Sequence, residues 1–244
     1  MTPRHDGRRP DELRPLAIRP GAAPYAEGSA LITMGGTEVL CAATIEERVP
    51  PHRRGQGGWV TAEYAMLPRA TAERTPRERG GRVDGRTQEI QRLIGRSLRM
   101  ATDLRALGDR TIIVDCDVLR ADGGTRTAAV TGGWVALALA AQRLVEARLC
   151  RRPPVPRAVA AVSVGILEGA PCLDLDYRED HRAGADLNCV MTDDGRFVEV
   201  QGTAEREPFD ESQLTAVLGL ARAGITALCA AQRAALAAGA PGAG

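Results

Sequence analysis

One stretch, from Thr111 to Leu149, constrains the fold of this chain more than any other. It begins with the run TIIVDCDVL, continues through the polar, glycine-rich segment RADGGTRTA, and ends in the apolar run AVTGGWVALALAAQRLVEARL. β-Branched residues favour a strand, whereas alanine and leucine at this density favour a helix. We therefore expect a strand that leads through a tight turn into a long apolar helix.

The turn that joins this strand to this helix has the features of an anion-binding site. The first backbone N–H groups of a helix have no intrahelical partners, and the helix dipole favours negative charge at that end. Gly123 and Gly124 allow a ligand to approach the main chain closely, and the Arg126 guanidinium suits phosphate oxygens. An ordinary strand-to-helix turn uses glycine in the same way, so the turn by itself supports both interpretations.

Net charge excludes one class of protein, and the cysteine spacing argues against structural zinc. The 244 residues carry a formal net charge of +1, which excludes the uniformly basic surface of a protein that binds nucleic acid everywhere. The 6 cysteines are dispersed without a CxxC pair, which favours reduced, buried thiols over structural zinc. The N-terminus has no apolar signal segment, and no apolar run approaches the ~20 residues that span a bilayer, so we expect a cytoplasmic protein without a membrane partner.

The rest of the chain is typical of two sets of strands, each followed by a helix. Residues 1–24 form an extended lead-in, and the proline-rich residues 151–157 separate the two halves. In the first half we expect a hairpin around Gly35-Gly36, a strand over 58–67 and a helix that carries Ile90 to Leu107. In the second half we expect strands over 158–167, 172–177, 186–192 and 196–203, a hairpin turn at 193–195, a helix over 210–238 and a disordered tail at 239–244. This pattern predicts an α+β fold rather than regular βαβ winding.

Residues 69–86 have the most unusual composition in the chain. They contain six arginines, three acidic residues, glycine and proline, but almost no apolar residue that would anchor them. A solvated surface loop of mixed charge has this composition, and so does a mobile arm whose guanidinium groups follow successive phosphates. Arg86 falls at the N-terminus of the following helix, where a cation is unfavourable unless an anion binds there.

Two pairs of aspartates are the best candidates for acid–base or metal chemistry. Asp174 and Asp176 share one face of the expected strand 172–177, and Asp180 and Asp186 flank a short acidic connection. Paired carboxylates beside a phosphate site are suited to hold Mg²⁺, and a protonated carboxyl would instead donate to a leaving oxygen. Aspartates that simply mark a strand end and a turn would give the same spacing.

Several long motifs follow one another in a fixed order over nearly the whole chain. They are GRTQEIQRLIGRSLR from Gly85, DCDVLRADGGTRTAAVTGG from Asp115, LDLDYREDHRAGADLNCVMT from Leu173 and EVQGTAE from Glu199. In sequence and order these motifs closely resemble the bacterial ribonuclease PH family. The resemblance implies a fold related to a ribosomal protein domain (ribosomal protein domain 2-like), with one domain of two sheet-and-helix halves over residues 1–238. It also implies a homo-hexameric ring, a trimer of dimers.

The activity that the resemblance implies is that of a phosphate-dependent 3′→5′ exoribonuclease, or tRNA nucleotidyltransferase. Inorganic phosphate, the co-substrate, attacks the last phosphodiester of an RNA such as the 3′ extension of precursor tRNA, and a nucleoside diphosphate is released. The residues implied by the matching motifs are Arg86, Gly124, Thr125 and Arg126 for phosphate, Asp180 and Asp186 for catalysis and for Mg²⁺, and Arg69, Arg74 and Arg77 for RNA. The arginine loop of one subunit is expected to serve the site of its neighbour.

Two other functions are compatible with parts of the sequence. A non-catalytic RNA-binding subunit of an exosome-type ring would keep the fold, but this chain carries both phosphate-site arginines and both aspartates. A metal-dependent hydrolytic nuclease would release nucleoside monophosphates rather than diphosphates. The phosphate dependence and the product therefore separate the alternatives.

Overall fold

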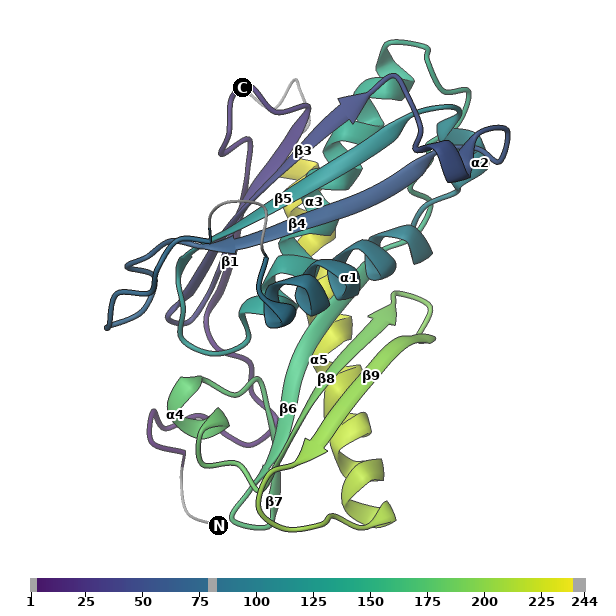
Figure 1. Ribbon diagram of the computed structural model, residues 1–244. Helices are drawn as coiled ribbons and strands as arrows, with labels where there is room; N and C mark the ends of the chain where they lie inside the picture. Colours follow the sequence, from purple (N-terminus) through teal and green to yellow (C-terminus); the bar gives the residue numbers. More distant parts are fainter. Residues whose placement is uncertain (1–3, 79–82, 239–244) are drawn as a thin grey trace.

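The computed structural model describes residues 4–78 and 83–238, which form two β-sheets with helices packed on and between them (Figure 1). The first half of the chain forms β1 (Leu16–Pro20), β2 (Gly28–Met34), β3 (Thr37–Glu46), a 3₁₀ turn (Pro51–Arg53), β4 (Trp59–Met66), α1 (Gly85–Met100), α2 (Leu104–Leu107), β5 (Thr111–Arg120) and α3 (Thr125–Glu146). The second half forms β6 (Val159–Leu167), β7 (Ala170–Leu173), α4 (Tyr177–Asp180), β8 (Ala185–Thr192), β9 (Phe197–Ala204) and α5 (Glu211–Ala238).

The first sheet has the strand order β1-β2-β3-β5-β4, and the second has the order β7-β6-β8-β9. Neighbouring strands are antiparallel except for β4 and β5, which run parallel. Parallel neighbours require a crossover connection, and the chain makes it through α1. The α+β class is confirmed, and the first sheet adds one crossover that the sequence analysis does not anticipate.

Both predicted hairpins are confirmed. β2 pairs with β3 around the turn at Gly35-Gly36, from Met34 opposite Thr37 to Gly28 opposite Ala43. β8 pairs with β9 around residues 193–195, where Gly195 has a φ of 81°. Both turns use glycine at a left-handed position, which is the local signal that the sequence provides.

Helix α3 forms the centre of the core. Most of its side chains are buried, and it packs against β2 and β3 of the first sheet and β6 of the second (Figure 1). Apolar residues of both sheets and of α1, α3 and α5 form one continuous cluster. The expectation of one domain over residues 1–238 stays a prediction, and the expected tail at 239–244 lies outside the described residues.

By length and composition, α3 and α5 are each apolar enough to cross a membrane, contrary to the sequence-based expectation that no such run exists. The burial of α3 between the sheets accounts for its apolar composition. The apolar side of α5, which includes Val217, Ile225 and Leu228, packs against β6 and β7.

The single helix predicted through Ile90 and Leu107 is two helices. α1 ends at Met100, and the Asp103 side chain accepts hydrogen bonds from the backbone N–H groups of Arg105 and Ala106 at 3.1 and 3.0 Å. Aspartate is a good N-cap and a poor interior helix residue, so it starts α2 instead of continuing α1. The apolar spacing continues across the break because both helices pack against β4.

The strand predicted over 172–177 is wrong beyond Leu173. β7 ends there, Asp174 has a left-handed backbone with a φ of 53°, and Asp176 caps α4. The lead-in predicted over residues 1–24 contains β1, which pairs with β2. Both errors involve long-range partners of these segments, which no local pattern reveals.

The close packing of α3 on the first sheet predicts that alanine substitution at two helical glycines changes the stability of the protein in opposite directions. A Cβ added at Gly132 would lie 2.7 Å from Ile32 Cγ2, whereas a Cβ at Gly219 of α5 would have nothing within 4 Å. We expect Gly219→Ala to stabilise the protein by about 0.5–1 kcal/mol, through helix propensity alone. We expect Gly132→Ala to destabilise it by about 1–3 kcal/mol, because the core is overpacked. Urea unfolding of both variants measures the difference, and equal changes would contradict the packing that we describe.

Candidate active site

A polar cleft with a volume of about 1060 Å³ opens where the N-termini of α1 and α3 face α4 and the β8–β9 hairpin. Its lining comes from segments that are far apart in the chain. It includes every residue that the resemblance assigns to phosphate or to catalysis, namely Arg86, Gly124, Thr125, Arg126, Asp180 and Asp186. The fold therefore brings the predicted anion-binding and acidic residues into one space.

One wall of the cleft is the turn of residues 121–126, which we call the glycine turn. Gly123 and Gly124 have φ of 74° and 63°, left-handed values that are costly for residues with a side chain. Gly124 is the N-cap of α3, so no cap side chain accepts from the first N–H groups of that helix. These N–H groups and the helix dipole favour an anion at this wall.

Two guanidinium groups line the cleft together with the glycine turn. Arg126 lies in the first turn of α3, and Arg86 lies in the first turn of α1. Burial raises the pKa of Tyr64, and the nearby charges of Arg86 and Arg126 oppose that rise. The Tyr64 hydroxyl donates to Thr125 Oγ1 at 2.8 Å, and this hydrogen bond holds the Tyr64 side chain beside the glycine turn. Both cations therefore lie near the same wall of the cleft.

The facing wall carries the predicted acids. Asp180 is the last residue of α4, and Asp186 is the second residue of β8. Loss of hydration raises the pKa of both carboxyl groups, and the negative charges of Asp180 and Glu205 raise the pKa of Asp186 further. Arg126 lowers both pKa values without cancelling the rise. Such carboxyl groups are suited to hold a cation together or to carry a proton.

Two further residues of the cleft escape the sequence analysis. Glu205 follows β9 and raises the pKa of both aspartates, yet no spacing in the sequence connects it to them. It ends the EVQGTAE motif, which is the signal that could have identified it. Ser163 on β6 also lines the cleft, and its buried hydroxyl has no hydrogen-bond partner among the described residues.

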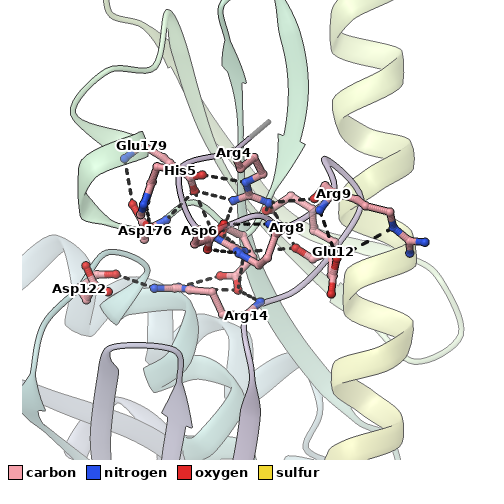
Figure 2. A network of polar contacts seen from close by, with 12 residues as sticks. Arg4, His5, Asp6, Arg8, Arg9, Glu12, Arg14, Asp122, Asp176 and Glu179 are labelled. Carbon is pink, nitrogen blue, oxygen red and sulfur yellow. Dashed lines mark hydrogen bonds and ion pairs between the residues drawn. The ribbon is translucent and has the colours of Figure 1, made fainter. Parts of the chain in front are cut away.

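The position of α4, and so of Asp180, depends on a buried network of arginines from the N-terminal segment (Figure 2). Asp176 and Glu179 form a capping box, in which each side chain accepts from the backbone N–H of the other. Glu179 is buried and also accepts from Arg4 Nε at 2.7 Å and from Arg8 Nη2 at 3.2 Å. Glu179, the residue before Asp180, is therefore held both by the capping box and by the two arginines.

Asp174 and Asp176 have structural roles. Asp174 is fully buried and accepts from Arg14, while Asp176 caps α4 and bonds His5 Nε2 at 2.5 Å. Among the described residues that line the cleft, neither is present. His5, Asp176 and Glu179 place ligand-type atoms within 4.8 Å of one another, but two guanidinium groups already neutralise Glu179, so the set is a poor cation site.

The predicted RNA-binding arginines lie outside the cleft of their own chain. Arg69, Arg74 and Arg77 are exposed on the segment between β4 and α1, which has no helix or strand in its described part. Thr71 of the same segment does line the cleft. Arg77 lies near enough to β5 to lower the pKa of Asp117, against the larger rise that burial causes. The segment thus begins beside the cleft, and its three described arginines Arg69, Arg74 and Arg77 lie outside the cleft lining.

Comparison with known proteins gives matches over almost the whole chain. The model of domain 1 of the 3′ exoribonuclease family matches residues 12–141, and that of domain 2 matches residues 157–224. Proteins named ribonuclease PH are similar, with 57% identity in Solibacter usitatus, covering 94% of this chain and 98% of that protein. The one from Methylobacterium radiotolerans is 58% identical and covers 93% of this chain and 97% of that protein.

Solved structures with the same fold are more distant in sequence. Rice Rrp46 superposes with a TM-score of 0.78 at 19% identity and covers 96% of this chain and 100% of its own. The Archaeoglobus fulgidus exosome with RNA bound to the active site gives a TM-score of 0.80 at 23% identity, covering 93% and 91% of the two chains. At this identity they establish the fold alone.

The raised pKa values of Asp180 and Asp186 lead to a stability prediction. A carboxyl group whose pKa is raised by folding destabilises the native state above that pKa, and the penalty vanishes when the group is protonated in both states. We expect Asp180→Asn and Asp186→Asn each to raise the melting temperature slightly at neutral pH, with the gain shrinking as the pH falls through the raised pKa and lost below about 4. Calorimetry across this range, without phosphate or RNA, measures it.

Asp194 provides the matched control. Its pKa is lowered by a hydrogen bond from Arg196, so its carboxylate stabilises the native state above its unfolded pKa. Asp194→Asn should therefore lower the melting temperature at neutral pH, by only a small amount because solvent screens this exposed pair. A loss of stability at neutral pH in both cleft variants would contradict the electrostatics that we assign to the cleft.

Proposed function

This chain belongs to the ribonuclease PH family and is a phosphorolytic 3′ exoribonuclease, and we propose that the cleft is the site where it performs phosphorolysis. One observation carries the proposal: Arg86, Arg126, Asp180 and Asp186, which come from four separate elements, line the same cleft. A cation pair beside an anion-binding turn, opposite a carboxylate pair, has the charge distribution that this reaction requires.

Inorganic phosphate binds at the glycine turn. The unpaired N–H groups at the start of α3 and the guanidinium groups of Arg86 and Arg126 supply its hydrogen bonds and neutralise its charge. The helix dipoles of α1 and α3 add to the positive potential at this wall. An anion at this position also relieves the unfavourable placement of both arginines in first helical turns.

The 3′ end of the RNA lies between the bound phosphate and the acids. An oxygen of inorganic phosphate attacks the last phosphodiester, the bond from phosphorus to the preceding 3′ oxygen breaks, and a nucleoside diphosphate leaves. The 3′ oxygen takes up a proton, for which Asp180 and Asp186 are suited because their pKa values are raised. The protein contributes chiefly position and charge, since both reactants are anions.

The same two aspartates fit Mg²⁺. This ion prefers carboxylate oxygens together with substrate phosphates, and the mutual repulsion of Asp180 and Asp186 is relieved by a divalent cation. As the alternative to proton donation, Mg²⁺ held by Asp180 and Asp186 would shield the negative charge of the phosphodiester.

We further propose a homo-hexameric ring of dimers in the cytoplasm. Arg74 and Arg77 are exposed and lie outside the lining of their own cleft, which supports a role toward RNA that enters the cleft of a neighbouring subunit. Precursor tRNA, with its 3′ extension, is the proposed substrate.

The phosphate-binding role of Arg86 has a direct test. We expect Arg86→Ala to lower kcat/KM for phosphate by about 10- to 100-fold, mainly through KM, because it removes charge-assisted hydrogen bonds. The assay follows release of nucleoside diphosphate from a short RNA at varied phosphate. Arg92→Ala, an exposed arginine on the same helix outside the cleft, should behave like the wild type.

The acids are tested in the same assay. Asp186→Ala should abolish turnover while RNA and phosphate still bind, because the substitution removes chemistry rather than affinity. Wild-type turnover in Asp186→Ala would refute the assignment. Nucleoside monophosphate as the product, formed without added phosphate, would show a hydrolytic nuclease instead.

The salt dependence of RNA binding tests the segment between β4 and α1 that carries Arg69, Arg74 and Arg77. Each guanidinium that neutralises one RNA phosphate contributes about one counterion to the salt dependence of binding. We expect Arg74→Ala to weaken RNA binding at low salt and to reduce the slope of log K against log salt by about 0.7 for a single strand. Arg151→Ala, another exposed arginine, is the control. Identical slopes in the two variants would exclude the segment from RNA binding.

A further inference from the structure

Arg14 lies outside the cleft and contacts both of the segments that build its two walls. It is buried, with 4% of its surface exposed, in the N-terminal segment just before β1. Its Nη2 and Nε donate to the two carboxylate oxygens of Asp174 at 2.7 and 3.0 Å. Its Nη1 donates to the backbone oxygen of Asp122 at 2.5 Å; Figure 2 labels both residues.

On the first wall, Asp122 belongs to the glycine turn. Thr37 holds the same turn, since its Oγ1 accepts from Asp122 N at 2.9 Å and donates to Gly123 O at 2.6 Å. A Cβ on Gly124 would lie 2.9 Å from Arg14 Nη2. The guanidinium therefore contacts the glycine turn directly, from a position outside the described lining of the cleft.

On the second wall, Asp174 begins the segment that leads into α4. The backbone of this segment lies directly on the glycine turn: a Cβ on Gly123 would be 2.6 Å from the carbonyl carbon of Asp176 and 2.7 Å from Tyr177 N. Tyr177 N also donates to Asp122 Oδ1 at 3.4 Å. Only glycine at position 123 permits this approach. The segment continues into α4, whose last residue is Asp180.

We propose that Arg14 is a positioning residue that sets the distance between the phosphate-binding turn and Asp180. It touches neither phosphate nor RNA, since the described lining of the cleft does not include it. The inference rests on the proposed function, because the two walls must act on one phosphodiester. A shift of about 1 Å between reacting groups costs on the order of 100-fold in rate, so this contact controls kcat.

The planar fork of arginine is what the position requires. One guanidinium reaches both oxygens of Asp174 and the carbonyl of Asp122 in fixed directions, whereas a lysine ammonium is a single point on a flexible stem. Lysine keeps the positive charge beside buried Asp174, so the substitution tests geometry without leaving a buried charge unpaired.

The test compares Arg14→Lys with Arg9→Lys, which changes an exposed arginine of the same segment. We expect Arg14→Lys to lower kcat at least tenfold per folded molecule, with phosphate affinity, measured by calorimetry, within about threefold of the wild type. This pattern is the reverse of the one expected for Arg86→Ala. A residue with a merely structural role would lower the melting temperature and leave kcat of the folded enzyme unchanged.

A second variant covers the case in which Arg14→Lys does not fold. The double change Arg14→Gln with Asp174→Asn removes both buried charges together, which avoids the cost of an unpaired ion. It should fold and lose kcat in the same way, because the shorter amide does not span Asp174 and Asp122. Wild-type kcat in either folded variant overturns the proposal. Absence of nucleoside diphosphate with the wild-type protein would instead refute the proposed function.

Discussion

Three buried guanidinium groups tie the N-terminal segment to the second half of this protein, and one of them, Arg14, also contacts the first half. Arg4 and Arg8 reach Glu179 and the carbonyl oxygens of Leu173 and Asp174 in the second half, and Arg14 pairs with Asp174 just before the chain enters the first sheet. Burying an ion pair is costly unless most of its donors and acceptors are used, and here each guanidinium makes several hydrogen bonds. The glycine turn and α4, and with them both walls of the cleft, rest on this network.

Sequence patterns predict the parts of the fold that depend on neighbouring residues. The strand, turn and helix over 111–149 and both hairpins are confirmed, because β-branching, apolar spacing and glycine at turns act locally. The stretch CLDLDY from Cys172 alternates like a strand, yet Asp174 leaves the sheet to meet an arginine 160 residues earlier in the chain. Nothing in the local pattern carries that information.

The cleft residues are a mixed case. Glycine and arginine at a helix start indicate an anion on physical grounds, whereas the convergence of Arg86, Asp180 and Asp186 on that turn required the family resemblance and then the three-dimensional fold. Neither the residue spacing nor the family resemblance identified Glu205, which the fold places in the cleft. The cleft also places like charges together: beyond the rise that burial causes, Glu205 raises the pKa of both aspartates, and Asp180 raises the pKa of Asp186. Such strain is typical of a site that is complete only when its substrates bind.

The pairing of Arg4 with Glu179 joins residues 175 positions apart, and this separation determines when the cleft can form during synthesis. The strands of the first sheet and α3 are complete once Glu146 has been made, so their pairing can begin as the chain emerges, before the second sheet covers α3. Arg4 and Arg8 are synthesised first and stay solvated until Glu179 of the second half has been synthesised. Assembly of the cleft is thus among the last events in the folding of the chain, and an incomplete chain lacks both of its walls in their final positions.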